Sequence, residues 1–138
     1  MANDQGKRDN AKRREASIQE RYSMYNKVVR TVPVRIASNE LERLLAARGP
    51  LAQWKAGPGG RSIVRECRFA NFEQTWGFLT GVAMRSHIWG HHPTITTTYT
   101  SVKLELSTHD IDSGSVSDID IKLAKRIEQG IGQYKDAD

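Results

Sequence analysis

Four histidines are the residues of this 138-residue chain best suited to chemistry, and all lie within one 23-residue stretch: His87, His91, His92 and His109. Imidazole suits proton transfer because its unperturbed pKa, about 6.5, lies near the pH at which most enzymes work. Three of the four flank a single β-rich segment, 94–108. They can share one pocket if that segment doubles back as a hairpin. The cluster therefore predicts an acid–base site, and the alternative is a group of surface histidines near turns.

A metal site is the competing interpretation of these histidines. His87 and His91 stand four residues apart and would share a helix face, as in helical zinc sites, if the preceding helix continued. Gly90 and Pro93 argue against that continuation. No cysteine or glutamate stands at the spacing of a third ligand. The sequence therefore favours acid–base chemistry over a metal centre.

Apolar residues at helical spacing predict four helices. The first begins near Asn10 and ends before Pro33, the second runs from about Ser38 to Gly49, the third ends near Ser86, and the fourth ends among Gly130 and Gly132. Capping residues are expected at Asn39 with Glu42, at Asn71 with Gln74, and at Ser117. The expected apolar stripes are Ile18, Tyr22, Tyr25 and Val29; Leu41, Leu44 and Leu45; Phe72, Trp76, Leu79 and Ala83; and Ile119, Leu123, Ile127 and Ile131.

Two strands are expected between these helices. Residues 61–69 alternate, although Arg65 interrupts their apolar face, and residues 99–108 alternate without interruption. A turn-rich loop, 54–60, precedes the first strand. Helices and strands are mixed, and few residues separate the strands after Pro93. This order indicates an α+β fold with an antiparallel sheet.

The net charge of +5 lies entirely in the first quarter of the chain. Residues 1–35 carry nine basic and four acidic side chains, whereas residues 36–138 carry twelve of each. A neutral body favours a small-molecule or protein-binding domain with a basic tail, and makes nucleic acid an unlikely partner. The apolar stripe expected in the tail suggests a helix that docks on a protein surface.

Other features of the composition bear on the protein's location. No stretch approaches the roughly 18 consecutive apolar residues of a membrane span, and the chain does not start with a secretory signal. The single cysteine, Cys67, excludes an internal disulfide framework and fits a reducing compartment. We therefore expect a protein of the cytoplasm or the nucleus, with no membrane contact.

At His91-His92-Pro93, Tyr99, Val102 and Ser107-Thr108-His109, the sequence resembles the pterin-4a-carbinolamine dehydratases. These proteins are also known as dimerisation cofactors of a homeodomain transcription factor. Supporting matches are Phe69-Ala70-Asn71-Phe72, Gly77-Phe78-Leu79-Thr80, Val82-Ala83, Asp120-Ile121 and Ile127-Glu128-Gln129. The similarity covers about residues 37–132 and leaves only the tail outside.

The resemblance implies a fold, an assembly and a reaction. The fold would be a four-stranded antiparallel sheet with helices packed on one face, here with an extra N-terminal helix, assembled as a homodimer or homotetramer. Residues 1–35 would be a basic extension and residues 36–138 the dehydratase-like domain. The reaction would be loss of water from 4a-hydroxytetrahydrobiopterin, giving quinonoid dihydropterin in tetrahydrobiopterin recycling, with no metal and no organic cofactor. A rival interpretation is a family member recruited as a protein-binding subunit or transcriptional coactivator.

The resemblance also assigns roles to residues. It implies acid–base work for His91 and His109 at the 4a-hydroxyl and the ring nitrogen, and pterin binding by His92. Further contacts with the substrate are expected from Trp54, His87, Ser107, Thr108 and Asp120. From the residues alone, Trp54 is equally a core tryptophan and Asp120 a helix-capping carboxylate. Two departures from the family pattern are His87-Ile88, where an acidic residue and often lysine stand, and a longer loop between His109 and Asp120.

Overall fold

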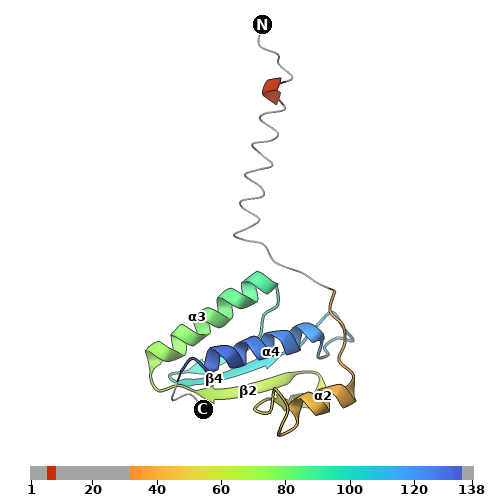
Figure 1. Ribbon diagram of the computed structural model, residues 1–138, viewed down its shortest axis with the longest axis vertical. Helices are drawn as coiled ribbons and strands as arrows, with labels where there is room; N and C mark the ends of the chain where they lie inside the picture. The colour runs from red at the N-terminus through yellow and green to blue at the C-terminus, as the bar shows by residue number, and fades with distance from the viewer. Residues whose placement is uncertain (1–5, 9–31, 135–138) are drawn as a thin grey trace.

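A four-stranded antiparallel sheet with helices on one face forms the body of the protein (Figure 1), which confirms the expected α+β class. The computed structural model describes residues 6–8 and 32–134. The strands are β1 (Lys55–Ala56), β2 (Ile63–Arg68), β3 (Thr94–Thr98) and β4 (Ser101–Leu106), in the order β1-β2-β4-β3. The helices of the body are α2 (Ser38–Leu45), α3 (Phe72–Trp89) and α4 (Asp118–Ile131).

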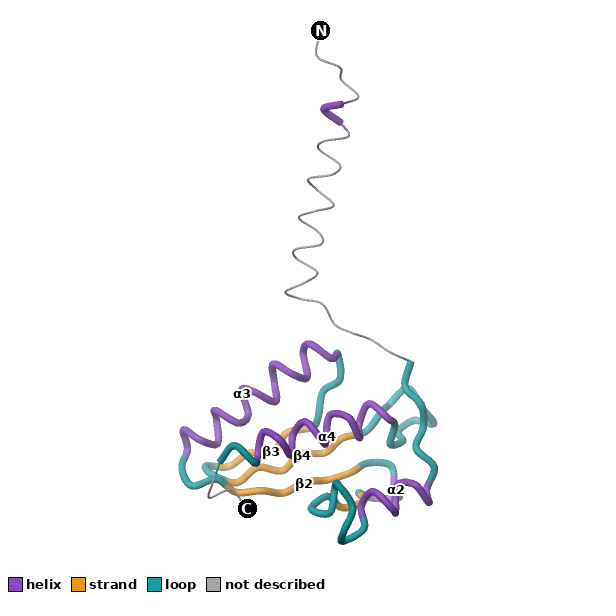
Figure 2. Tube along the Cα trace, in the orientation of Figure 1, coloured by secondary structure: helices purple, strands orange, loops and turns teal. Residues whose placement is uncertain are grey.

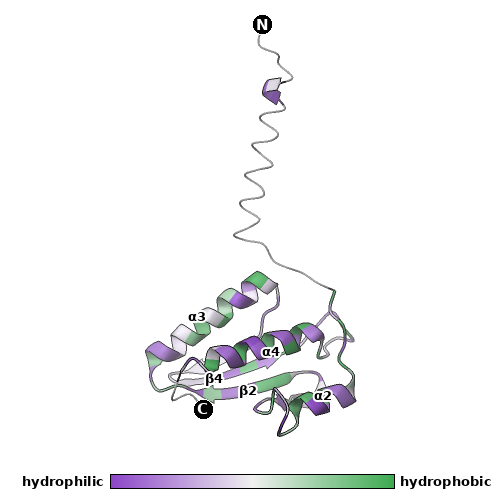
Figure 3. Ribbon diagram, viewed as in Figure 1, coloured by the Kyte–Doolittle hydropathy of each residue, from purple (hydrophilic) through white to green (hydrophobic). Residues whose placement is uncertain are grey.

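The hydrophobic core lies between this sheet and helices α3 and α4, which run side by side across it (Figure 2). Strand β4 contributes Val102, Leu104 and Leu106, which alternate with polar residues as the sequence predicts. Helix α4 contributes Leu123 and Ile127, and the alternation of polar and apolar turns along this helix is visible in Figure 3. The expected stripe of the last helix is thus largely confirmed.

The hairpin that the histidine cluster requires is present. Strands β3 and β4 pair from Thr94 with Glu105 to Thr98 with Ser101. The turn between them contains Tyr99, whose φ of 54° lies in the left-handed region, so the strand expected from residue 99 begins at Ser101 instead. The hairpin reverses the chain direction, which brings the segment after α3 and the end of β4 to the same end of the sheet.

Helix α2 differs from its expected form at both ends. It begins at Ser38 after Ala37, and the Asn39 side chain accepts from the neighbouring Glu40 N–H at 2.9 Å, so Asn39 and Glu42 form no capping box. The helix ends at Leu45, before the expected Gly49, and a turn follows in which the Leu51 N–H donates to the Leu44 carbonyl at 3.2 Å. Leu41 and Leu44 are buried as expected.

Helix α3 buries a different face from the expected one. Leu79 is in the core, but Phe72 and Trp76 are 48% and 47% exposed, and Ala83 is exposed as well. The buried residues are instead Thr75, Phe78, Leu79, Val82 and Ser86. The sequence of α3 is apolar on more than one side, so periodicity alone could not select the side that meets the sheet. Asn71 does cap the helix, accepting from the Gln74 N–H at 2.8 Å.

The arginine that interrupts the apolar face of β2 is held by a buried ion pair. The Arg65 Nε donates to Glu128 Oε1 of α4 at 2.7 Å, and only 7% of the arginine side chain is exposed. The indole N–H of Trp54 donates to the same oxygen at 2.8 Å. Trp54, Arg65 and Glu128 form what we call the core polar triad.

The chain enters the body at Val34, next to the start of α4. The Val34 N–H donates to Asp118 Oδ1 and the Asp118 N–H donates to the Val34 carbonyl, both at 2.9 Å. Val34, two residues before the expected boundary at residue 36, is therefore already bound to the body. The expected N-terminal helix, with Ile18, Tyr22, Tyr25 and Val29, lies outside the described residues.

Candidate active site

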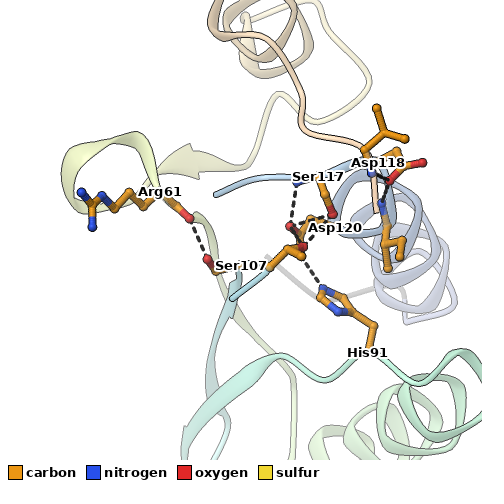
Figure 4. A network of polar contacts seen from close by, with 9 residues as sticks. Arg61, His91, Ser107, Ser117, Asp118 and Asp120 are labelled. Carbon is orange, nitrogen blue, oxygen red and sulfur yellow. Dashed lines mark hydrogen bonds and ion pairs between the residues drawn. The ribbon is translucent and has the colours of Figure 1, made fainter. Parts of the chain in front are cut away.

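A fully buried carboxylate organises the histidine region. Asp120 occupies the first turn of α4, where the helix dipole favours negative charge, and it is 0% exposed. Its Oδ1 meets His91 Nε2 at 2.5 Å. Its Oδ2 accepts from the Ser117 N–H at 2.9 Å and from the Thr108 hydroxyl at 2.8 Å. Figure 4 shows the His91 ring reaching toward Asp120 from the loop after α3.

Two hydroxyls share the Oδ2 atom of Asp120. The Thr108 hydroxyl donates to it at 2.8 Å, the Ser117 hydroxyl lies 3.4 Å from it, and the two hydroxyls are 2.6 Å apart. An ionised carboxylate only accepts, so Nε2 of His91 carries a proton. In a neutral imidazole the other nitrogen, Nδ1, is then an acceptor. The network therefore holds His91 with Nδ1 free to take a proton.

The other two family histidines lie beside this network. His92 follows His91 and His109 follows Thr108, so each is one residue from a side chain that binds Asp120. Both are exposed, unlike His91, whose side chain is 15% exposed. The fold thus holds the His91 ring against the buried carboxylate and places His92 and His109, both exposed, next in the chain to residues that bind it.

His87 belongs to the last turn of α3, before the loop that carries His91. It lies on the exposed side of α3, and the helix ends at Trp89 because Gly90 adopts a left-handed conformation with φ of 64°. His91 therefore leaves the helix and does not share a face with His87, which removes the geometry that a helical zinc pair needs. Among residues 6–8 and 32–134, no group of three or more His, Cys, Asp or Glu side chains is placed to hold a metal ion.

Ser107 and Trp54 are engaged elsewhere. The Ser107 hydroxyl donates to the Arg61 carbonyl at 2.7 Å and ties the end of β4 to the loop before β2 (Figure 4). Trp54 is 1% exposed and belongs to the core polar triad. Its partner Glu128 is eight residues beyond Asp120, about 12 Å along α4. The structure therefore supports the interpretation of Trp54 as a core residue and not as a wall of the histidine site.

Sequence reasoning treated Ser117 only as a helix cap. In the structure its hydroxyl also supports Thr108, and its N–H binds the carboxylate that holds His91. The signal was present in the sequence as the three-residue spacing of Ser117 and Asp120, which is that of a capping box. The sequence shows the capping box, but only the fold shows that its aspartate, Asp120, also binds His91 from the loop after α3.

A family model for pterin 4 alpha carbinolamine dehydratase matches residues 34–130 of the chain. The chain belongs to this family. Its members are dehydratases, and the chain is accordingly an enzyme of this class. The match contains every residue of the Asp120 network, and it begins at Val34, which is bound to Asp118 at the start of α4.

Individual relatives agree with the family match. One relative is a Saccharomyces cerevisiae protein that carries the assigned name pterin-4-alpha-carbinolamine dehydratase. It is 48% identical to this chain over 122 residues, which cover 80% of this chain and 98% of the yeast protein. A Novosphingobium aromaticivorans protein of the same assigned name is 39% identical, covering 65% of this chain and 91% of its own length. A Brucella melitensis crystal structure, described as a transcriptional coactivator/pterin dehydratase, is similar with a TM-score of 0.63 and 28% identity, covering 70% of this chain and 98% of that one.

Within the described part of the chain, no helix has both the length and the apolar character needed to cross a bilayer.

Proposed function

We propose that the protein removes water from 4a-hydroxytetrahydropterin, giving quinonoid dihydropterin and so serving the recycling of tetrahydrobiopterin. The observation that carries this proposal is the hydrogen bond between His91 and the buried carboxylate of Asp120, found in a chain of the dehydratase family. A histidine held in this way is oriented for proton transfer, and the carboxylate stabilises the imidazolium that forms when the ring takes a proton.

Each histidine has a role in this proposal. His91 takes the proton of the pterin ring nitrogen at its free Nδ1, because Nε2 is engaged by Asp120. His109 gives a proton to the 4a-hydroxyl, so that the carbon–oxygen bond breaks and water leaves. His92 binds the pterin at the solvent side. One proton is taken and one is given, so the reaction releases only water. Thr108 and Ser117 position Asp120 and do not meet the substrate in this proposal.

The test is dehydration of 4a-hydroxytetrahydropterin by the purified full-length chain, followed by absorbance as the substrate is generated. Acid–base catalysis contributes about 10²–10⁴-fold to a rate, and we expect an acceleration of this size over the spontaneous reaction. The rate should be the same with a chelator present. No acceleration by folded protein would refute the proposal, and loss of activity to the chelator would favour the metal interpretation.

A second candidate function, protein binding, is favoured by the exposed face of α3. Phe72, Trp76, Met84 and Ile88 lie at spacings that place them along one side of the helix, and each is between 43% and 57% exposed. Strand β3 is also a sheet edge, with one row of backbone groups unpaired within the described chain. We propose that a second copy of the chain covers these surfaces, as a homodimer or homotetramer.

This proposal predicts the effect of a charge on the α3 face. Trp76→Glu should lower the molar mass measured by light scattering to that of a smaller species, because a carboxylate cannot be buried unpaired in an apolar interface. Arg48→Glu, an exposed change beyond the end of α2, is the matched control and should leave the mass unchanged. If the wild-type protein is monomeric at all concentrations, the proposal of self-association is refuted, and the α3 face would bind a different protein.

A further inference from the structure

A strongly basic cleft lies between the last turns of α3 and the outer side of α4, separate from the histidine site. It has a volume of about 350 Å³ and is lined by Arg85, Trp89, Lys122, Lys125, Arg126 and Gln129. We call it the basic cleft. Four of its six lining residues are cationic and none is acidic. Residues 36–138 are neutral in total, but four of their twelve basic side chains gather at this cleft.

Trp89 holds two of these cations together. The Arg85 guanidinium carbon lies 5.2 Å from the centroid of the indole, and the Lys122 Nζ lies 4.4 Å from it, both within the range of a cation–π contact. The two charges come from different helices and are at most about 10 Å apart, close to the Debye length at 0.1 M salt. They therefore repel each other, and an anion bound near both would relieve that repulsion.

No carboxylate of the described chain neutralises the cleft. None of the ion pairs among these residues includes Arg85, Lys122, Lys125 or Arg126. The Arg126 Nη1 donates to the neutral Gln129 side chain at 3.0 Å. Glu40 of α2 is close enough to Lys125 for their charges to attract each other, but the Glu40 carboxylate is already bound by Arg43. The cleft therefore presents uncompensated positive charge to solvent.

We propose that the basic cleft binds a small anion that carries two or more phosphate groups. The volume of the cleft lies near the lower end of the range found for small-molecule binding sites. Arginine offers planar pairs of donors that match phosphate oxygens, and lysine adds point charges, so two of each can engage several phosphates at once. A long nucleic acid would require a basic face that continues beyond the cleft, but the rest of residues 36–138 carries twelve acidic side chains against eight basic ones. This inference does not depend on the dehydratase reaction.

The experiment is a titration of the full-length chain with tripolyphosphate, by calorimetry and by tryptophan fluorescence. We expect one saturable site that Lys122→Glu and Arg126→Glu each weaken at least tenfold. Both side chains lie at the surface, and circular dichroism would show that the variants fold. Lys55→Glu makes the same charge change on exposed β1 and should weaken binding less than twofold. Trp89→Phe should remove most of the fluorescence change.

Three further arms identify the ligand. Citrate, which carries three carboxylates, should bind at least tenfold more weakly than tripolyphosphate if phosphate is recognised. ATP binding more tightly than tripolyphosphate would indicate a nucleotide, and equal binding a bare polyphosphate. Two outcomes would overturn the proposal: binding that the cleft variants and Lys55→Glu weaken equally, or no saturable binding. Tighter binding of oligothymidylate with increasing length would overturn it in favour of a nucleic-acid surface.

Discussion

Replacing His91 with alanine is expected to lower kcat for pterin dehydration by about 10²–10⁴-fold, the usual contribution of a general acid or base. KM should change much less, because the proposal gives substrate binding mainly to His92. The loss follows from the geometry of the Asp120 network, which holds the ring with one nitrogen engaged and the other free. Steady-state rates of the purified variants, measured with chelator present, provide the test.

Three companion variants make this result specific. Asp120→Asn preserves size but can offer an amide N–H to His91, so the ring would lose the orientation that leaves Nδ1 free, and kcat should fall on a similar scale. His92→Ala should chiefly raise KM. His87→Ala is the matched histidine control, since its ring lies on the exposed side of α3, and it should stay within twofold of wild type. Wild-type kcat in folded His91→Ala would refute the role of His91, and a large loss in His87→Ala would place His87 in the site.

Local features of the site could be predicted from the sequence. Ser117 and Asp120 are three residues apart, and the run of Thr and Ile after Pro93 indicates β structure, so the helix start and the hairpin both follow from short-range patterns. The functional meaning of Asp120 could not be predicted in this way. It depends on His91, 29 residues earlier, and on Thr108 at the end of β4, and both reach the carboxylate only through the sheet and helix packing.

Helix α3 shows a different limit. Its sequence offers two apolar sides, one through Phe72 and Trp76 and one through Phe78 and Val82. Periodicity measures whether apolar residues recur, but it cannot decide which side meets a sheet whose position is unknown. Similarly, Arg65 appears in the sequence as a break in a strand. Only the fold shows that Glu128, 63 residues away, supplies its partner.

The core polar triad leads to the prediction with the largest effect on stability. Glu128→Ala should lower the free energy of unfolding by about 3 kcal/mol, since removing one partner of a buried ion pair leaves an uncompensated charge. The Arg65 guanidinium, 7% exposed, would lose its counter-charge and keep only the hydrogen bond from its Nη1 to the Glu66 carbonyl, and the Trp54 indole N–H would lose its acceptor. We place the effect at the lower end of the usual range because Glu128 remains 26% exposed. Urea unfolding followed by circular dichroism measures it.

Two variants separate the loss of charge from the loss of packing. Glu128→Gln keeps an acceptor for Trp54 and a neutral partner for Arg65, so it should destabilise the protein by less than Glu128→Ala. The double variant Arg65→Met with Glu128→Leu removes both charges together, and apolar replacement of a buried pair is often close to neutral. It should therefore recover much of the stability lost in Glu128→Ala, while the unpaired Trp54 N–H prevents full recovery. If the double variant is less stable than Glu128→Ala, the ion pair itself stabilises this core, and unpaired charge is not the main cost.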